Sequence, residues 1–325
     1  MNKCKTTKRK KIRCVVVMCL LAALLLTSCG KEEPPAFLDF LNADGGYDIS
    51  GDYDLKEIDL AALGIKRPGG ICVYNDSIYV CDISNNCIVK LNKDLVKEAV
   101  YGTLGMEEGN FSEPRDIVFA GDCFYVLDSG NDRVQKFTSD FQYLEEYYLG
   151  PLHSKMGFSR YISIAVDKKG VIYVSTNAAD VWDAYIYRRE DGSWDKLGEE
   201  AVGYLCAGEG NIYFANLFEF KVEEKKTSMG SGENSLYMIQ NGKLKPLVQI
   251  RVSYAPTALT YQDGCFYMIS FGYKTVNRLS VQEETFDTLL ALPMACPYMY
   301  MEVDEEGNLY ISDSENGCFY VAEKQ

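Results

Sequence analysis

The sequence predicts an all-β protein, a six-bladed β-propeller built of four-stranded antiparallel blades. Three observations lead to this fold class. A short apolar unit with a tyrosine at its centre recurs six times, a tight-turn signal precedes each copy, and the two ends of the repeat region supply complementary parts of one blade. Repeats of about 40–50 residues are typical of propeller blades.

The tyrosine units recur at a nearly regular interval. Successive tyrosines are 46, 48, 40, 54 and 43 residues apart, which accommodates four short strands and their turns. The six units are Ile78-Tyr79-Val80, Phe124-Tyr125-Val126, Ile172-Tyr173-Val174, Ile212-Tyr213-Phe214, Phe266-Tyr267-Met268 and Leu309-Tyr310-Ile311.

Each unit is expected to be the second strand, strand b, of a blade. Turn residues such as Gly121-Asp122 precede it and supply the backbone angles of a tight hairpin. The apolar stretch before each turn, as in Asp116-Ile117-Val118-Phe119, is expected to be strand a. In three blades an Asp-x-x-Asn pattern follows strand b, and its side chains are expected to bond the turn backbone. These pairs are Asp82 and Asn85, Asp128 and Asn131, and Asp313 and Asn316.

Blade two carries the most specific pattern in the chain. It comprises Glu113-Pro114-Arg115-Asp116-Ile117 and Tyr125-Val126-Leu127-Asp128-Ser129-Gly130-Asn131-Asp132-Arg133-Val134-Gln135-Lys136-Phe137. This pattern resembles the NHL-repeat family of six-bladed β-propellers. Blades one and six match it in part, with cysteine in place of the arginine, and the other three blades match in strand rhythm. The resemblance implies the propeller fold and a role as an interaction scaffold.

The ends of the repeat region are expected to complete one blade. Gln325 follows directly after strand c of blade six, so that this blade lacks a fourth strand. At the other end, the segment Leu55-Lys56-Glu57-Ile58-Asp59-Leu60 has the pattern of an outer strand. We therefore predict that residues 53–325 form the propeller, closed by a strand at about 55–60 that hides two sheet edges.

Residues 1–28 are predicted to be a lipoprotein signal peptide. Seven basic residues and no acid precede the uncharged run Cys14–Leu26, which is too short to span a membrane. The next residues, Leu26-Thr27-Ser28-Cys29-Gly30, resemble the lipobox of bacterial lipoproteins. The resemblance implies cleavage before Cys29, a lipid on its sulfur and anchorage to the bacterial cell membrane outside the cytoplasm. An ordinary signal peptide is the alternative.

The exported part of the chain is strongly acidic. Removal of the signal changes the net charge from −14 to −21, because the signal holds seven basic residues and no acidic one. Such a chain repels phosphate, so we expect no nucleic-acid partner. Residues 29–52 contain Pro34-Pro35, Gly45-Gly46 and many acids, and are predicted to be a flexible, lipidated tether.

Eight cysteines follow Cys29, and none of them forms the Cys-x-x-Cys pair of a zinc site. Several lie in apolar strand-like runs, for example Cys72 and Cys123, where a free cysteine behaves as a small hydrophobic residue. We expect mostly free thiols, with one or two disulfides as the alternative.

Residues that indicate catalysis are scarce in the sequence. The one histidine, His153, is expected to lie in a loop without a role, and a single histidine cannot form a multi-histidine metal site. The segment 304–308 looks like a calcium loop, but its counterpart in blade three contains Lys168 and Lys169, which favours turn geometry. We expect no cofactor and no metal site, with calcium as an open alternative.

A ligand site is expected at one end of the central channel, where the loops that enter strand a and leave strand b meet. Mixed aromatic, arginine and carboxylate groups at a concave mouth suit a polar ligand or a peptide. The alternative is a ring of structural ion pairs, in which Asp82 and Asp128 are the expected partners of the arginines. The candidate residues are Arg115, Arg160, Tyr161, Tyr204, Tyr298, Asp82, Asp128 and Asp313.

The sequence thus predicts a membrane-anchored, extracytoplasmic propeller without catalytic activity. Its expected partners are the membrane, through the lipid on Cys29, and a protein or cell-surface glycan at the propeller face. Two alternatives stay open. One is a calcium-dependent propeller enzyme similar to lactonases or esterases, and the other is a structural subunit of an envelope complex.

Overall fold

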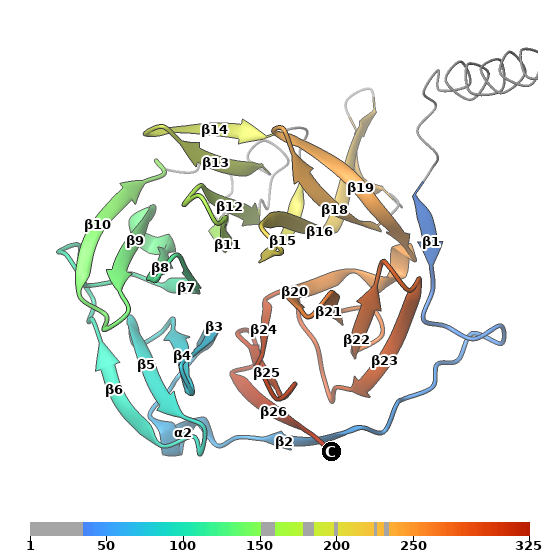
Figure 1. Cartoon of the computed structure of the whole chain (residues 1–325), viewed down its shortest axis with the longest axis horizontal. Helices are drawn as coiled ribbons and strands as arrows, with labels where there is room; N and C mark the ends of the chain where they lie inside the picture. Colours follow the sequence, from blue (N-terminus) through green and yellow to red (C-terminus); the bar gives the residue numbers. More distant parts are fainter. Residues whose placement is uncertain (1–34, 151–159, 178–184, 198–200, 224–225, 231–233) are drawn as a thin grey trace, which may run out of the picture. The chain divides into compact units, whose positions relative to one another are not determined.

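Six blades surround a central channel in the computed structural model of the chain (Figure 1). The structure describes residues 35–150, 160–177, 185–197, 201–223, 226–230 and 234–325. Each blade is an antiparallel sheet whose first strand lies nearest the axis. The predicted fold class, a six-bladed β-propeller, is confirmed.

Blades one to three follow the predicted strand order a to d from the axis outward. Their strands are β3 (Pro68–Tyr74), β4 (Ser77–Asp82), β5 (Cys87–Asn92) and β6 (Lys97–Tyr101); β7 (Pro114–Ala120), β8 (Cys123–Asp128), β9 (Arg133–Thr138) and β10 (Tyr143–Tyr148); and β11 (Arg160–Val166), β12 (Ile172–Asn177), β13 (Ile186–Glu190) and β14 (Ser193–Leu197).

Blades four to six complete the ring, and blade four carries two additional strands, β1 (Ala36–Leu38) and β17 (Lys226–Gly230). The regular strands are β15 (Val202–Gly208), β16 (Asn211–Glu223), β18 (Asn234–Gln240) and β19 (Lys243–Ile250); β20 (Pro256–Gln262), β21 (Cys265–Ser270), β22 (Thr275–Ser280) and β23 (Thr285–Ala291); and β24 (Met299–Val303), β25 (Leu309–Asp313), β26 (Cys318–Lys324) and β2 (Tyr53–Glu57). Short helices occur at α2 (Leu60–Leu63), η1 (Ser129–Asn131) and η2 (Val252–Tyr254).

The recurring tyrosines hold neighbouring blades together. All six lie on strand b of their blades, and they are only 4–8% exposed. Each belongs to a different apolar cluster. Five of these clusters lie between two adjacent blades, and that of Tyr213 lies mainly between blades four and five and also includes Ile162 and Tyr300. A blade in the ring has a neighbouring blade on each face, so a large aromatic side chain at the same place in every repeat fills the same gap six times.

The ring closes as predicted, by pairing of the two ends of the repeat region. Strand β2 pairs antiparallel with β26, with Leu55 opposite Ala322. The closing strand lies slightly earlier than the predicted range of 55–60, because Leu60 begins helix α2. Asp59 caps this helix by accepting a hydrogen bond from the Ala61 backbone N–H at 3.0 Å, and Leu60 and Leu63 are buried.

Residues 35–52 differ from the predicted flexible tether. From Ala36 onward the chain runs along the outside of blades four, five and six (Figure 1). Strand β1 pairs in parallel with β19, and Ile49 forms a bridge with Thr288 of blade five. Phe40 holds this segment against the ring, because its side chain is 6% exposed and packs among the rings of Tyr254, Tyr273 and Phe286.

The structure also bears on the thiols and on the membrane. All eight cysteines downstream of Cys29 are free thiols, as expected, and five of them are buried. Across the described ranges no helix has the length and apolarity that a membrane crossing requires. The signal peptide, Cys29 and His153 lie outside the described residues, so these predictions remain expectations.

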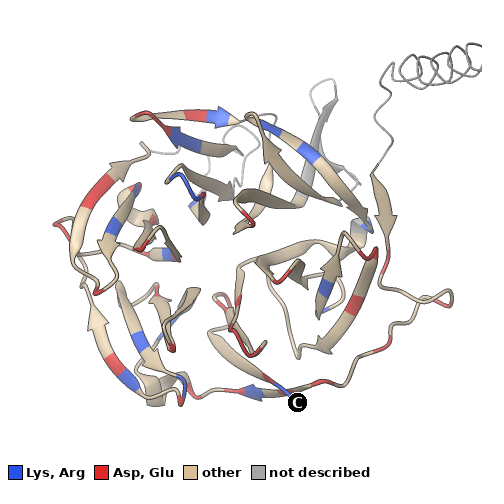
Figure 2. Ribbon diagram, in the orientation of Figure 1, with Lys and Arg blue, Asp and Glu red and all other residues tan. Residues whose placement is uncertain are grey.

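The strands define two faces of the ring. We call the end at which the innermost strands begin the upper face; Arg115 and Arg160 lie there. The opposite end, where the a–b turns such as Asn75-Asp76 lie, is the lower face. Acidic residues occur on every blade (Figure 2).

Candidate functional site

The upper face brings together some of the predicted residues. The Glu113 Oε2 atom lies 3.3 Å from Arg115 Nη2 and 3.5 Å from Arg160 Nε. The Arg115 guanidinium also lies over the ring of Tyr298, 5.9 Å from its centroid. The prediction that Asp82 and Asp128 pair with these arginines was wrong. Glu113 is the partner instead, because it directly precedes β7 at the same end of the channel.

Arg115 is incompletely satisfied. Its side chain is 6% exposed, and its Nε atom has no hydrogen-bond partner within the described part of the chain. A guanidinium has five N–H donors, and burial of an unpaired donor is costly. Arg115 therefore has a hydrogen-bond donor that its described neighbours do not use.

The predicted aspartates have a different role. Asp82, Asp128 and Asp313 are fully buried at the ends of strands b. Each accepts a hydrogen bond from the side chain of the asparagine three residues later, for example Asn316 Nδ2 to Asp313 Oδ2 at 2.7 Å. Asp82 and Asp313 also accept from the backbone N–H of that asparagine, whereas Asp128 accepts from the backbone N–H of Ser112. These contacts close the b–c turns, as the Asp-x-x-Asn pattern predicts. We do not retain these three residues in the candidate site.

Two tyrosines cross the channel below the upper face. The Tyr300 hydroxyl of β24 donates to the Ile162 carbonyl of β11 at 2.9 Å, and the Tyr204 hydroxyl of β15 donates to the Pro297 carbonyl at 2.5 Å. Their rings meet edge to face, with centroids 5.9 Å apart. Tyr204 is thus a buried structural residue rather than part of an open mouth. Tyr161 is also buried, and its hydroxyl donates to the Gly150 carbonyl at 2.9 Å.

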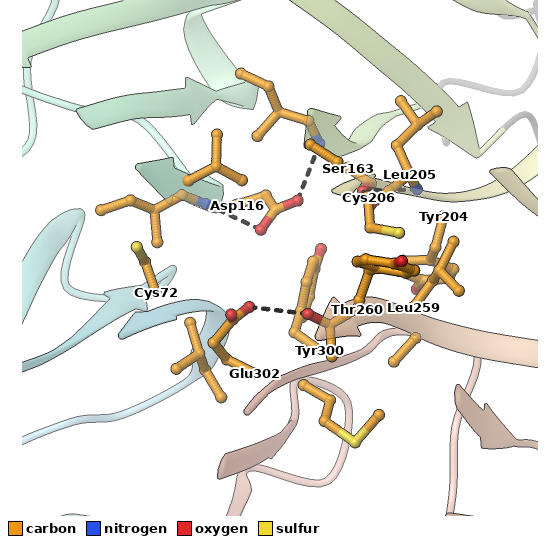
Figure 3. Close-up of a pocket in the computed structure, with 18 of the residues that line it drawn as sticks. Cys72, Asp116, Ser163, Tyr204, Leu205, Cys206, Leu259, Thr260, Tyr300 and Glu302 are labelled. Carbon is orange, nitrogen blue, oxygen red and sulfur yellow. Dashed lines mark hydrogen bonds between the residues drawn. The ribbon is translucent and has the colours of Figure 1, made fainter. Parts of the chain in front are cut away.

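A cavity of about 220 Å³ lies along the axis and is lined by the innermost strands of all six blades (Figure 3). Asp116 of β7 and Glu302 of β24 face into it. Asp116 accepts from the backbone N–H groups of Ile117 and Ile164, both at 2.9 Å. Glu302 accepts from the Thr260 hydroxyl at 3.4 Å. Asp116 therefore joins two inner strands, whereas the Glu302 carboxylate has a long hydrogen bond from Thr260 and a backbone contact with Val303.

Burial changes the acidity of both groups. It raises the pKa of Asp116 to about 7, against the opposing effect of the hydrogen bonds from Ile164 and Ile117. It raises the pKa of Glu302 to about 8; the Thr260 hydrogen bond opposes this rise, and the nearby Asp116 charge adds to it. Removal of a carboxylate from water disfavours its charged form, so both groups take up protons near neutral pH.

Neither carboxylate is among the site residues predicted from the sequence. Asp116 is predicted only as part of strand a in blade two. A signal was available, because each acid interrupts an apolar innermost strand, in Asp116-Ile117-Val118 and in Met301-Glu302-Val303. Buried acids in such strands are rare unless they have a partner or a function.

The residues that resemble a calcium loop are arranged as a turn. Asp304 Oδ1 accepts from the Asn308 backbone N–H at 2.8 Å, and Oδ2 accepts from Asn308 Nδ2 and the Tyr310 hydroxyl. Across the described residues, no group of three or more His, Cys, Asp or Glu side chains is placed to hold a metal ion.

The fold defines the class of protein: a six-bladed β-propeller. No protein-family model matches the sequence, and no characterised protein matches it. Several solved propellers are similar in structure. Virginiamycin B lyase from Staphylococcus aureus is 13% identical, with a TM-score of 0.53 over 84% of this chain and 100% of that one. A glucose dehydrogenase is 11% identical, with a TM-score of 0.59 over 84% and 99%.

A third similar structure is a protein of unknown function from Bacteroides thetaiotaomicron. It is 14% identical, with a TM-score of 0.56 over 83% of this chain and 72% of that one. At such low identity the likeness concerns the fold alone. The particular function must therefore be argued from this chain's own residues.

Proposed function

We propose that this protein is a lipid-anchored, extracytoplasmic binding propeller. Its upper face recognises a protein or a cell-surface glycan by binding a carboxylate group of that ligand. The observation that carries the proposal is Arg115. Its buried guanidinium donates a hydrogen bond to Glu113 at 3.3 Å, and its Nε has no partner among the described residues. A ligand carboxylate would complete this donor set in the bidentate geometry that arginine favours.

The surroundings of Arg115 support recognition of an extended ligand. Arg160 lies beside Glu113 and its side chain is 40% exposed, so a second guanidinium is accessible at the same face. The Tyr298 ring beside Arg115 is partly exposed. Aromatic and arginine side chains together are typical of binding surfaces for peptides and glycans. The NHL resemblance agrees with such a scaffold.

The acidic charge of the exported chain limits its partners. A net charge of −21 repels nucleic acid, so we propose none as a ligand. Membrane attachment is proposed through the lipid on Cys29 and not through a basic surface. Only six residues lie between Cys29 and Ala36, the start of β1, so the seven steps along the chain reach at most about 25 Å when fully extended. The propeller would therefore stand close to the membrane.

The anchoring part is tested with Cys29→Ala, expressed in a bacterial host that processes lipoproteins. The substitution removes the sulfur that forms the thioether, so incorporation of labelled palmitate should be lost. Cys318→Ala, which changes a partly exposed thiol in the propeller, is the matched control and should still be labelled. Labelling of the Cys29→Ala chain would refute the lipoprotein assignment.

The binding part is tested with arrays of acidic glycans and acidic peptides, each paired with its neutral amide. The mature chain should bind carboxylate members in preference to their amides. Arg115→Met should weaken this binding roughly tenfold or more, because a charge-assisted hydrogen-bond donor is lost. Arg278→Met is the control, because Arg278 is an exposed arginine paired with Asp287 on blade five. Equal binding by the Arg115→Met chain would show that the ligand binds elsewhere.

A further inference from the structure

The axial cavity is separate from the Arg115 cluster. Tyr204 and Tyr300 cross the channel between them, and both side chains are held by hydrogen bonds to backbone carbonyls. Figure 3 shows the Asp116 and Glu302 carboxylates on the other side of the space from Leu259 and Cys206. A ligand in this cavity would therefore not contact the upper-face site.

The lining of the cavity is acidic, and no cationic side chain among the described residues accompanies its two acids. Asp116 and Glu302 are the two acidic residues of the lining, and no Lys, Arg or His is among the described residues that line it. The Asp116 carboxylate packs closely against Gly70. A residue with a side chain would clash there, because its Cβ atom would lie only 2.3 Å from Asp116 Oδ1. This close approach fixes the carboxylate in place, so the two acids are built into the walls of the cavity.

Two uncompensated carboxylates are unfavourable in a buried space. Burial of an ionised group without a counter-charge is costly, and proteins otherwise pair such groups or neutralise them. The Glu302 carboxylate has only the Thr260 hydroxyl at 3.4 Å as a side-chain contact. A bound cation would remove this cost by supplying the missing charge and hydrogen-bond donors.

The cavity opens toward the lower face. On two of the innermost strands the lining becomes more exposed toward this face, from the buried Tyr300 to the partly exposed Glu302 on β24, and from the buried Asp116 to the partly exposed Val118 on β7. A second hollow lies directly beyond, between the a–b turns of blades five, six and one, and Val73 lines both. Access from this side therefore does not require the tyrosines to move.

The second hollow is also acidic. Its carboxylates are Asp76, Asp263, Asp304 and Glu305. Its one basic residue, Lys93, is already paired with Asp76 at 2.9 Å and with Glu306 at 2.7 Å. A funnel of one charge sign raises the local concentration of ligands of the opposite sign. The path into the cavity and the cavity itself thus favour the same class of ligand.

We propose that the axial cavity binds a small organic cation, a primary alkylammonium, that enters from the lower face. An ammonium offers three N–H donors for Asp116, Glu302 and the hydroxyl of Thr260. Its alkyl part would lie against the apolar lining, which includes Ile117 and Leu259. A metal ion fits less well, because the described residues provide no cluster of three metal-binding side chains here.

The test measures binding of butylamine to the purified mature chain by calorimetry and by thermal unfolding. Butan-1-ol has a similar shape without the charge, and calcium chloride provides the alternative cation. We expect butylamine to bind and to raise the unfolding temperature, and butan-1-ol at the same concentration to have no effect. Affinity should rise between pH 6 and pH 8.5, because the carboxylates ionise in this range while the amine stays protonated.

The residue-level test uses Glu302→Gln, which keeps the size of the side chain and removes its charge. Butylamine affinity should fall roughly tenfold to a hundredfold. Glu283→Gln changes an exposed carboxylate on blade five and should leave affinity unchanged. Equal stabilisation by butan-1-ol, stabilisation by calcium without an effect of butylamine, or a pH-independent affinity of the wild-type chain would each overturn the proposal. The pH series requires no variant, so it stands even if the Glu302→Gln chain does not fold.

Discussion

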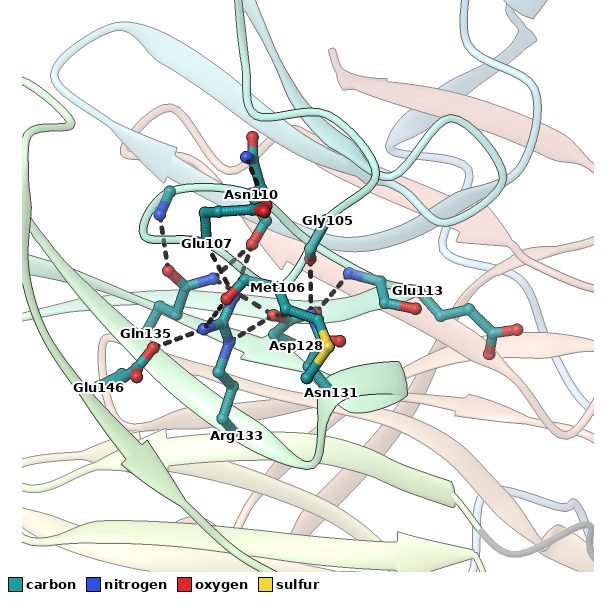
Figure 4. Close-up of polar contacts among 12 residues, drawn as sticks. Gly105, Met106, Glu107, Asn110, Glu113, Asp128, Asn131, Arg133, Gln135 and Glu146 are labelled. Atoms are coloured by element: carbon teal, nitrogen blue, oxygen red, sulfur yellow. Dashed lines mark hydrogen bonds and ion pairs between the residues drawn. The ribbon is translucent and has the colours of Figure 1, made fainter.

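The Arg133 guanidinium lies against the Asp128 carboxylate, with Nε 2.8 Å from Oδ2, and neither side chain is more than 1% exposed (Figure 4). The same guanidinium donates to the carbonyls of Met106 at 2.8 Å and Asn110 at 2.9 Å, and it pairs with Glu146 at 2.5 Å. Arg133 thus fastens the loop that precedes blade two onto the blade itself. The most specific part of the NHL-like pattern is a structural network.

Blades one and six have no arginine at the position that attaches the preceding loop in blade two. Cys87 and Cys318 occupy the positions that correspond to Arg133. In blade one the Asn85 side chain donates to the Gly64 carbonyl at 3.2 Å, at the end of helix α2. A short capped helix there replaces the extended loop of blade two. The sequence pattern varies because the preceding loop varies, while the Asp-x-x-Asn turn stays the same.

We predict that Arg133→Met destabilises the propeller by about 3–5 kcal/mol, the typical effect of leaving one partner of a buried ion pair without its counter-charge. Denaturant unfolding of the mature chain measures this free energy. Arg278→Met, which removes an exposed pair with Asp287, should cost only about 0–1 kcal/mol. If both substitutions lowered the free energy of unfolding equally, the Arg133 network would contribute no more than a surface ion pair.

Much of the fold was predictable from local pattern. The tyrosine units and their turns repeat, so the strand order within each blade follows from the sequence alone. Closure was predictable because β26 needs an outer neighbour and residues 53–60 provide one. The closing strand ends earlier than predicted because Asp59 caps helix α2, which begins at Leu60, and this depends on a single capping contact.

The channel was not predictable in the same way. Tyr300 of blade six bonds to Ile162 of blade three, so the partner lies 138 residues away in the chain. Which side chains cross the axis depends on how far each innermost strand is shifted along it, and bulges in β3, β7, β11 and β20 change that shift. Sequence spacing carries little information about such shifts. The pairing of Arg115 with Glu113 and the axial acid pair therefore emerged only from the structure.

Phe40 should hold the N-terminal segment on the ring. Phe40→Ala removes a ring that lies 5.0 Å from the ring of Tyr273 and 5.4 Å from those of Tyr254 and Phe286, centroid to centroid. A loss of about 3–5 kcal/mol is expected if the segment unfolds together with the blades. Phe37→Ala is the matched control in strand β1, because its side chain is 58% exposed. Limited proteolysis should cut the Phe40→Ala chain between residues 36 and 50 faster than the control, and equal cutting would contradict the role of Phe40.

Strand β2 should be required for closure of the ring. A chain that begins at Ile58 leaves the outer edge of β26 unpaired, so aggregation or loss of cooperative unfolding is expected. A chain that begins at Gly51 lacks β1 and the Ile49 bridge but keeps β2, which separates closure from the other N-terminal contacts. Both chains are compared by light scattering and denaturant unfolding. Matching denaturant midpoints for the two chains would rule out a closing role for β2.

The axial acids should make stability depend on pH near neutrality. Because burial raises the pKa of Asp116 to about 7 and that of Glu302 to about 8, the folded state retains protons that the unfolded chain has released. Their contribution is fully present below the unfolded pKa values, near 4, and is lost as the pH rises through 7 and 8. The free energy of unfolding should therefore fall between pH 6 and pH 9, where exposed carboxylates are already ionised.

Glu302→Gln isolates one of these two contributions. Without the Glu302 proton, the decline of the denaturant midpoint between pH 6 and pH 9 should become shallower, and at pH 9 the variant should be more stable than the wild-type chain because no charge is buried at this position. Glu283→Gln, an exposed carboxylate, should keep the wild-type slope. A Glu302→Gln chain with the wild-type slope would mean that Glu302 is already ionised in the folded protein at neutral pH, and that the axial cavity holds a permanent negative charge.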